Sequence, residues 1–298
     1  GAEIPGLTIK SDGSWAFDPA DSAYQGLANG DTQTITVNYS VTDSSFATDT
    51  NSFDITLTGT NDIPVVDTTA ISNLAGGAED TPYTITKAQL LAGFSDADRN
   101  ATTGEQQALE INGLTATTTD ANGLTVSVGT FSLNQSETSW TFTPSDNFNG
   151  TVNLNYNVTD GIESTAATNS FELASVNDAP LLTGVKPTLT PNATEDLEYT
   201  ISTNDLLAGY TDADIDNDPG STQTLSILGL SAQEGGVISN NNNGTYTFKP
   251  NPDVNGTITL NYVIADGVGG NALATSSFDI DAVNDKLSAH LNASGSVK

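Results

Sequence analysis

The sequence predicts an all-β protein made of tandem antiparallel β-sandwich domains that follow one another end to end as a rod. Apolar residues alternate with Thr, Asn and Ser, as in the run Val152, Leu154, Tyr156, Val158, and a period of two indicates strands with one buried face. Asn-Gly and Asp-Gly pairs separate these runs as turns. Whole segments also recur at a fixed spacing, which indicates that one fold is repeated along the chain.

Asn-Asp pairs mark the boundaries of the repeats. The linker Asn61-Asp62-Ile63-Pro64 recurs as Asn177-Asp178-Ala179-Pro180, and Asn284-Asp285 follows at the end of the next unit. Leu-Leu-Ala-Gly followed by Asp-x-Asp occurs once in each of the two complete units. We therefore expect four parts: an incomplete sandwich unit at 1–62, repeats at 63–178 and 179–285, and a tail or the start of a next unit at 286–298.

The first unit contains only the later strands of the repeat. Its Trp15-x-Phe17-x-Pro19 motif matches a strand motif found in both complete repeats, whose aromatic residues we interpret as core. The Glu-Asp and Asp-Ala-Asp segments are absent from it, so we expect the chain to be part of a longer protein. The helical signal is one short turn per complete repeat, where Thr86-x-x-Gln89 and Ser202-x-x-Asp205 resemble capping boxes.

Composition excludes several classes of function. The chain has 7 Lys and Arg against 37 Asp and Glu, a formal charge of -30, no Cys and one His. Such a surface repels nucleic acid and anionic membranes, and zinc sites of the Cys/His type, disulfides and Cys nucleophiles are excluded. No apolar run approaches the ~20 residues of a membrane helix. A Ser-His-Asp triad on His290, close to the end of the chain, is not expected.

The direction of the strands predicts which carboxylates meet. The linker, the Asp-x-Asp segment and the Asp that ends the Tyr-x-Val-x-Asp strand should share one end of a repeat, and the Glu-Asp pair should lie at the opposite end. Stacked repeats then form two junctions. The first collects Asn61, Asp62, Asp96, Asp98 and Asp160, with Asp18 or Asp21 as further donors; the second collects Glu79, Asp80, Asn177, Asp178, Asp212, Asp214 and Asp266.

So many carboxylates require a cation to neutralise them, and a set of hard oxygen ligands favours Ca²⁺ over Mg²⁺. A single Asp-x-Asp is usually a solvated turn, but here the whole set recurs. The run from Asp212 to Asp218 resembles an EF-hand loop, yet Asn217 and Gln223 stand where that loop needs Gly and Glu, so an EF-hand is rejected. Paired acids could also serve a glycosidase, although acids duplicated in every unit are more easily structural. We expect no enzyme activity.

Residues 62 to 285 resemble the cadherin-like tandem repeats of large bacterial RTX adhesins. The resemblance rests on the Asn-Asp-x-Pro linkers, Leu-Leu-Ala-Gly, Asp-Ala-Asp, the Asn-Gly-Thr turns and the Tyr-x-Val/Ile-x-Asp-Gly ending. Residues 6 to 62 resemble the second half of a VCBS repeat, through Asp12-Gly13-Ser14-Trp15 and Thr58-Gly59-Thr60-Asn61-Asp62. The last linker departs from the pattern, because Asn284-Asp285 is not followed by Pro.

The resemblance implies immunoglobulin-like or cadherin-like sandwiches in a surface protein exported by type I secretion. It implies an extracellular location on a bacterial cell, Ca²⁺ at the junctions, and neighbouring repeats of the same chain as the direct partners. Our leading hypothesis is an extender that spaces a distal adhesive domain from the cell for adhesion and biofilm formation. The alternative is a module that itself binds a glycan or a host or neighbouring cell.

Overall fold

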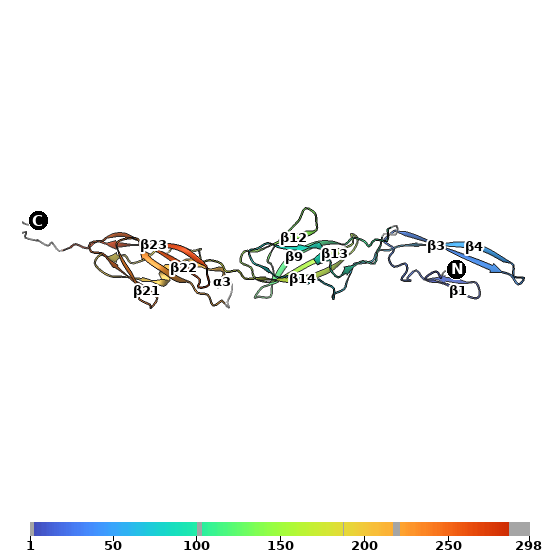
Figure 1. Ribbon diagram of the computed structural model, residues 1–298, viewed down its shortest axis with the longest axis horizontal. Coiled ribbons are helices and arrows are strands. Elements are labelled where there is room, and N and C mark those ends of the chain that lie inside the picture. Colours follow the sequence, from blue (N-terminus) through green and yellow to red (C-terminus); the bar gives the residue numbers. More distant parts are fainter. Residues whose placement is uncertain (1–2, 100–102, 187, 217–220, 286–298) are drawn as a thin grey trace, which may run out of the picture. The chain divides into compact units, whose positions relative to one another are not determined.

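The computed structural model describes residues 3–99, 103–186, 188–216 and 221–285, and its regular secondary structure is almost entirely strand (Figure 1). The chain divides into two compact units, Gly1–Ser175 and Val176–Lys298, each treated separately below. Within the first unit we distinguish the first segment, residues 3–62, from the middle repeat, residues 63–175. The second unit contains the last repeat, residues 176–285. No described helix is long and apolar enough to cross a membrane.

The middle repeat is a two-sheet antiparallel sandwich. One sheet has the strand order β10-β9-β13-β14-β6, the other has the order β11-β12-β7, and β5 pairs with β8. Its elements are β5 (Val65–Val66), β6 (Gly77–Ala78), β7 (Tyr83–Thr86), α1 (Lys87–Leu90), β8 (Phe94–Ser95), β9 (Glu110–Thr119), β10 (Thr125–Ser127), β11 (Gly129–Leu133), β12 (Ser139–Pro144), β13 (Gly150–Thr159) and β14 (Ser164–Ala174).

The core of this repeat follows the predicted alternation. On β13, every second side chain from Val152 to Val158 is buried. Phe142 of β12 packs against them from the opposite sheet and meets Phe171 edge to face at 5.7 Å. The Tyr156 hydroxyl donates to the backbone carbonyl of Leu90 at 3.0 Å. The period of two therefore produces the buried face, and a buried hydroxyl stays paired because it reaches the helical turn.

The described part of the last repeat has the same topology except that no strand corresponds to β10; its sheet orders are β16-β23-β22-β19 and β17-β21-β20, and β15 pairs with β18. Its elements are β15 (Leu181–Leu182), β16 (Ala193–Thr194), β17 (Tyr199–Ser202), α2 (Thr203–Leu207), β18 (Tyr210–Thr211), α3 (Ala213–Asp216), β19 (Ser226–Ala232), β20 (Gly236–Asn240), β21 (Thr245–Pro250), β22 (Gly256–Ala265) and β23 (Asn271–Asp281). The turn α3, which lies within the Asp-x-Asp segment, was not predicted.

One of the two predicted capping boxes is complete. Thr86 accepts from the backbone of Gln89, and the Gln89 side chain accepts from the Thr86 backbone in return. At α2, the Ser202 hydroxyl accepts instead from Asn204, and the helix has a simple N-cap. The prediction of a second box was wrong; Asp205 has one methylene fewer than Gln89 and so a shorter reach back to the cap.

The first segment contains four strands in two separate pairs: β1 (Leu7–Ile9) with β2 (Trp15–Phe17), and β3 (Thr32–Thr42) with β4 (Thr48–Thr58). By sequence, β3 and β4 correspond to β13 and β14 of the middle repeat. Tyr39 of β3 is 40% exposed, whereas its counterpart Tyr156 is 4% exposed. Among the described residues, the β3–β4 hairpin has no edge strands equivalent to β9 and β6 and no strand equivalent to β7 in a facing sheet, so residues of core type are left open.

Candidate metal centres

The first linker is held to the middle repeat through its own polar groups. The Asn61 side-chain amide donates to the Asp62 carbonyl at 2.9 Å and to Asp160 Oδ2 at 2.9 Å. The backbone N–H of Asp62 donates to Asp98 Oδ2 at 3.0 Å. The bonds to Asp160 and Asp98 join positions far apart in sequence, and they bring the linker, the Asp-x-Asp segment and the end of β13 together as the strand directions predict.

Asp96 and Asp98 are the most deeply buried carboxylates of this set, with exposed fractions of 4% and 0%. Asp96 Oδ1 accepts from the backbone N–H of Asp98 at 2.8 Å. The other oxygen of Asp96, Oδ2, and Oδ1 of Asp98 are buried without a hydrogen-bond partner, as is the amide oxygen of Asn61. Buried acceptor oxygens that lack a partner are costly, and three of them in one set indicate a place for a cation.

The electrostatics of the set separate its carboxylates into two kinds. Burial raises the pKa of Asp96, and the charges of Asp98 and Asp160 raise it further. Burial also raises the pKa of Asp98, with additional contributions from Asp62, Asp160 and Asp31. Burial acts in the same direction on Asp160, but the N–H groups of Glu163 and Ile162 and the amide of Asn61 outweigh it and lower the pKa of Asp160.

The second linker repeats this geometry inside the last repeat. The Asn177 amide donates to the Asp178 carbonyl at 2.9 Å and to Asp266 Oδ2 at 2.7 Å. The Asp178 N–H donates to Asp214 Oδ2 at 2.7 Å, and the Asp214 N–H donates to Asp212 Oδ1 at 3.1 Å. Four equivalent hydrogen bonds thus form twice, on sequences that share only the motif residues.

Two equivalent pairs have pKa shifts in the same direction: Asp96 with Asp212, and Asp160 with Asp266. Burial raises the pKa of Asp212, and the carboxylates of Asp214 and Asp266 add to the effect. Burial would also raise the pKa of Asp266, yet the Asn177 amide and the N–H groups of residues 268 to 270 lower it. These two pairs of equivalent carboxylates therefore share the direction of their pKa shifts as well as their hydrogen bonds.

Glu79 and Asp80 lie at the opposite end of the middle repeat from the first linker. Glu79 is buried and accepts from the Asn149 amide at 3.4 Å, and Asp80 accepts from the Asn147 N–H at 3.3 Å. Both partners precede β13, whereas Asp160 follows it. This agrees with the strand directions argued from sequence; the assignment of Glu79 and Asp80 to the second linker stays a prediction.

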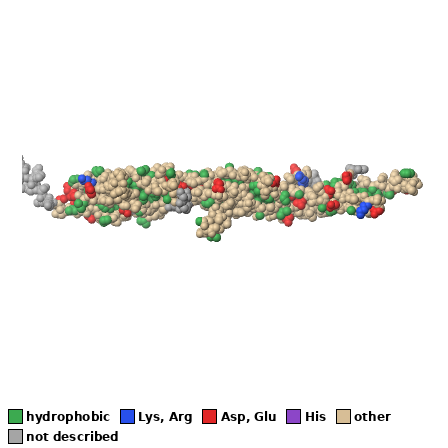
Figure 2. Space-filling model, turned by 90° about the horizontal axis from the view of Figure 1, so that it is seen from below, with side chains coloured by type: hydrophobic (Ala, Val, Ile, Leu, Met, Phe, Trp, Pro, Cys, Tyr) green, Lys and Arg blue, Asp and Glu red, His purple; other side chains and the backbone are tan. Residues whose placement is uncertain are grey.

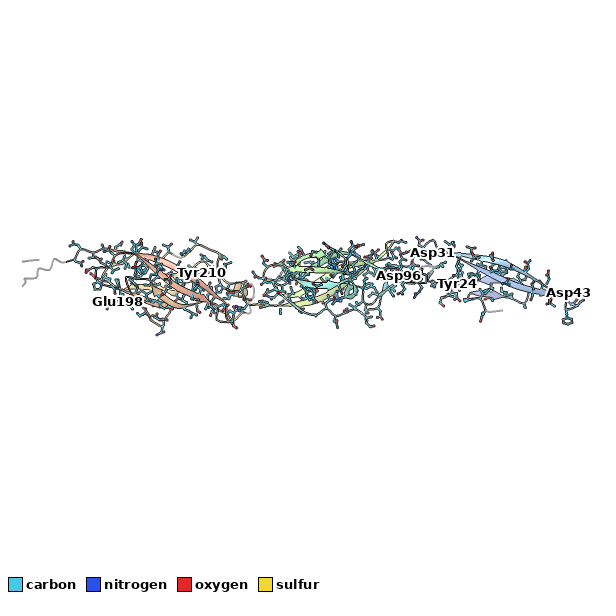
Figure 3. All side chains as sticks on the ribbon, turned by 45° about the horizontal axis from the view of Figure 1, so that its top comes forward. Tyr24, Asp31, Asp43, Asp96, Glu198 and Tyr210 are labelled. Carbon is cyan, nitrogen blue, oxygen red and sulfur yellow. The ribbon has the colours of Figure 1, made fainter. Side chains whose placement is uncertain are left out.

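Asp18 and Asp21, the further donors suggested for the first linker, serve local turns. Asp18 accepts from the Ala20 N–H at 2.9 Å, and Asp21 accepts from the Ala23 N–H at 3.0 Å. The first segment instead contributes Asp31, whose charge acts on Asp98; Figure 3 labels Asp31 and Asp96. The Gly26 carbonyl accepts a hydrogen bond from the Arg99 N–H at 2.9 Å, which joins this part of the first segment to the middle repeat.

Sequence reasoning missed two kinds of residue. Glu163 accepts from the Asn61 amide at 3.4 Å, although no repeated motif contains it. Gln107 and Gln223, which occupy equivalent positions, donate to the Asp160 carbonyl at 2.8 Å and to Asn177 Oδ1 at 3.2 Å respectively. The two glutamines recur at the spacing of the repeats, and this recurrence could have identified them as linker residues from the sequence.

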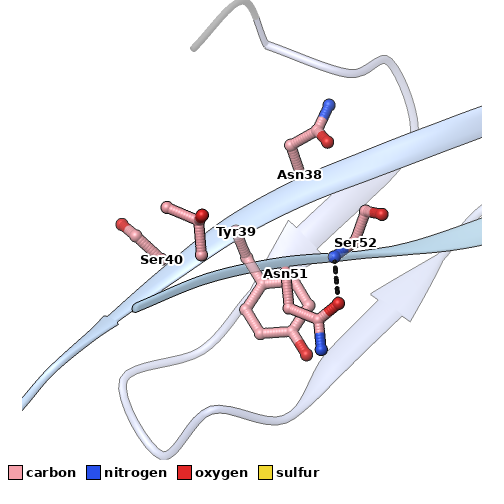
Figure 4. Close-up of a pocket in the computed structure, with 6 residues that line it drawn as sticks. Asn38, Tyr39, Ser40, Asn51 and Ser52 are labelled. Atoms are coloured by element: carbon pink, nitrogen blue, oxygen red, sulfur yellow. Dashed lines mark hydrogen bonds between the residues drawn. The ribbon is translucent and has the colours of Figure 1, made fainter. Parts of the chain in front are cut away.

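An open groove lies on the first segment, along the paired strands β3 and β4. Figure 4 shows its lining of Asn38, Tyr39, Ser40, Asn51 and Ser52, with the Ser52 N–H donating to Asn51 Oδ1 at 2.8 Å. In the complete repeats the position of Tyr39 belongs to the core, so the missing strands account for the exposure of this ring.

The donor set fits calcium better than a metal that requires nitrogen or sulfur ligands. Among the residues that the structure describes, no group of three or more His, Cys, Asp or Glu side chains is arranged so that it could hold a metal ion. Each linker instead mixes carboxylates with an amide side chain and backbone carbonyls, and hard oxygen ligands of this mixed kind suit Ca²⁺. The bare oxygens of Asn61, Asp96 and Asp98 are the ones that an ion would satisfy.

Comparison with known proteins adds a family. The model of the cadherin-like domain matches residues 60–174 and 176–281, more than half of the chain. No curated protein sequence matches.

Several solved structures are weakly similar. Mouse cadherin-23 EC22-24 is 14% identical with a TM-score of 0.44, over 94% of this chain and 83% of that one. The human desmocollin-1 ectodomain is 13% identical with a TM-score of 0.38, over 97% of this chain and 53% of that one. An endo-fucoidan hydrolase of glycoside hydrolase family 107 is 17% identical with a TM-score of 0.31, over 95% of this chain and 38% of that one. This chain therefore spans less than two thirds of the last two. From the family match, the chain belongs to the cadherin-like domain family.

Proposed function

We propose that this chain is an extender segment of a bacterial cell-surface adhesin, stiffened by calcium bound at its Asn-Asp linkers. Cadherin-like domains are in general extracellular and calcium-binding, and tandem copies of them suit adhesion or an extender role. The observation that supports the proposal most directly is the duplicated set of four hydrogen bonds around buried carboxylates. The motifs quoted from the sequence favour the RTX class of adhesin and, for the first segment, a VCBS-type repeat.

Charge explains how such an extender responds to its surroundings. Without an ion, the ionised carboxylates of one linker repel each other and are poorly solvated because they are buried. A bound Ca²⁺ removes both costs and connects the linker to the two loops that surround it. At ten times its dissociation constant, an ion contributes about 1.4 kcal/mol per independent site. The sites perform no chemistry on a substrate in this proposal, which assigns the chain no enzyme activity.

The test compares thermal unfolding in calcium and in EDTA, together with calorimetric titration of Ca²⁺. Asp98→Asn keeps the shape of the side chain and removes one charge from the buried set. Asp120→Asn is the matched control, because Asp120 is an exposed carboxylate that accepts turn N–H groups in the same repeat. We expect Asp98→Asn to raise the unfolding temperature in EDTA by relieving repulsion, and to shrink the stabilisation by calcium. Asp120→Asn should do neither.

Two outcomes contradict the proposal. An unfolding curve that is unchanged by chelation, with no heat of binding on titration, would remove calcium from the account. Equal calcium stabilisation in the Asp98→Asn and Asp120→Asn variants would place any bound ion away from the first linker.

A further inference from the structure

The two linker sites share four hydrogen bonds but differ in the hairpin that closes each of them. In the middle repeat the hairpin between β13 and β14 contains Glu163, whose Oε2 accepts from the Asn61 amide at 3.4 Å. In the last repeat the hairpin between β22 and β23 contains Gly269 and Gly270 at this place. The first site therefore has a carboxylate on its rim that the second site lacks.

The second site excludes a side chain from its hairpin. A Cβ at Gly270 would lie 2.2 Å from Asp266 Oδ2, 2.5 Å from the Asp178 carbonyl oxygen and 2.9 Å from the Asn177 amide nitrogen. All three atoms belong to the hydrogen bonds that define the site. The backbone thus fills the space, and a carboxylate could not be added at this position without displacing the linker.

The linker asparagines also differ in the state of their amide oxygen. Asn61 Oδ1 is buried and has no hydrogen-bond partner. Asn177 Oδ1 accepts from the Gln223 amide at 3.2 Å. The equivalent glutamine of the middle repeat, Gln107, donates to the Asp160 carbonyl instead, at 2.8 Å. Of the two asparagine oxygens, the first is therefore available to a cation and the second is engaged, while the oxygen of Gln223, Oε1, is the buried amide oxygen without a partner at the second site.

We propose that the first linker site binds calcium more tightly than the second and fills first as the calcium concentration rises. The inference rests on the proposed function, and it depends on one carboxylate that only the first site offers, Glu163, since each site has one buried amide oxygen without a partner. Arg99 follows Asp98 in the sequence, but its charge is not among those that shift the pKa of Asp96, Asp98 or Asp160. Since ligand charge tunes calcium affinity over several decades, we expect the two dissociation constants to differ about tenfold.

Unequal sites make the response of the chain to calcium gradual. Between the two midpoints the first linker is ordered by its ion while the second is not. Glu163 is then a specificity-determining residue for this order of filling.

Hydrogen exchange measured by mass spectrometry over a calcium series tests the proposal, because peptides around residues 61 and 98 report on the first site and peptides around residues 177 and 214 on the second. We expect protection of the first set at about one tenth of the calcium concentration that protects the second. Glu163→Gln should raise the midpoint of the first set toward that of the second and leave the second unchanged. Glu137→Gln, an exposed turn carboxylate of the same repeat, is the charge-matched control.

Each outcome bears on one of the two proposals. Coincident midpoints in the unmodified protein, or a first midpoint that Glu163→Gln does not move more than Glu137→Gln does, overturn the order of filling and leave calcium binding intact. Absence of calcium-dependent protection in both sets overturns the proposed function itself. Glu163 is exposed, so its substitution should not prevent folding, and the protection of the core strands checks this directly.

Discussion

Asp96, Asp98 and Asp212 are buried acids whose charge the fold alone does not neutralise. Burial raises their pKa values, and neighbouring carboxylates raise them further. Asp160 and Asp266 differ because three or more N–H groups converge on each of them. Their pKa values are lowered in spite of burial. The same residue type thus acquires opposite tendencies according to the donors that its loop provides.

These shifts predict how the calcium-free protein responds to pH. Asp96, Asp98 and Asp212, whose pKa values are raised, take up protons at a higher pH in the folded state than in the unfolded state. The free energy of unfolding should therefore increase as the pH falls from neutral toward the ordinary Asp pKa of 3.8. Asp160 and Asp266, whose pKa values are lowered, stabilise the fold above pH 3.8. This stabilisation is lost as the pH falls through their folded pKa values, which lie below 3.8. In EDTA, the unfolding temperature should therefore pass through a maximum in mild acid.

Thermal scans in EDTA across this pH range measure the effect. Asp98→Asn should flatten the rise on the neutral side of the maximum, whereas Asp120→Asn should preserve it. A rise of equal size in both variants would mean that relief of the overall negative charge, and not the buried acids, produces it.

At the scale of elements, the β13–β14 and β3–β4 hairpins are nearly equal in length but differ in support. In the middle repeat, β9 pairs with the free edge of β13 and β6 pairs with that of β14. Among the described residues, β3 and β4 pair only with each other. An isolated two-stranded hairpin is marginally stable in water. Trp15 and Phe53, in contact at 4.9 Å, are a partial substitute for the missing layer.

We predict that backbone amides paired between β3 and β4 exchange with solvent about tenfold or more faster than those paired between β13 and β14, which corresponds to a difference of about 1.4 kcal/mol in opening free energy. The comparison is internal, because both hairpins lie in the same unit and are measured in one sample. Equal protection of the two hairpins would show that another part of the chain, or a second molecule, covers the first segment.

At the scale of the whole molecule, the dominant quantity is the formal charge of -30. Figure 2 shows acidic side chains on the described surface with few basic ones between them. In the described part of the chain a single ion pair forms, between Lys87 and Glu110 at 2.5 Å. Repulsion within the folded state is therefore largely uncompensated unless cations from solution screen or bind these groups.

This charge predicts a salt dependence that calcium should suppress. In EDTA, the unfolding temperature should rise by several degrees as NaCl increases from about 0.01 M to 0.15 M, over which the screening length falls from about 30 Å to 8 Å. With calcium bound, the same change in NaCl should have a smaller effect, because the closest repulsions are already neutralised. Sucrose at matched osmolality controls for effects that do not depend on charge. A salt effect of equal size in calcium and in EDTA would contradict the prediction.

The sequence by itself determined the repeated sandwich and the location of the acids within it. A period of two specifies which side chains face the core, as from Val152 to Val158. Turn pairs and linkers then fix the direction of each strand, and direction alone decides that Asp98 and Asp160 share an end of the repeat while Glu79 does not. Both properties are local or topological, so they can be read without coordinates.

Only the tertiary structure decided what each polar group does at the linkers. Gln107 and Gln223 are the same residue at equivalent positions, yet one binds a backbone carbonyl and the other binds Asn177 Oδ1. The hairpin after β22 starts at Asp266 and ends at Gly270, whereas the one after β13 runs only from Asp160 to Glu163, and this length changes which atoms reach the linker. Hydrogen bonds depend on tenths of an ångström and on loop length, which residue type and spacing do not specify.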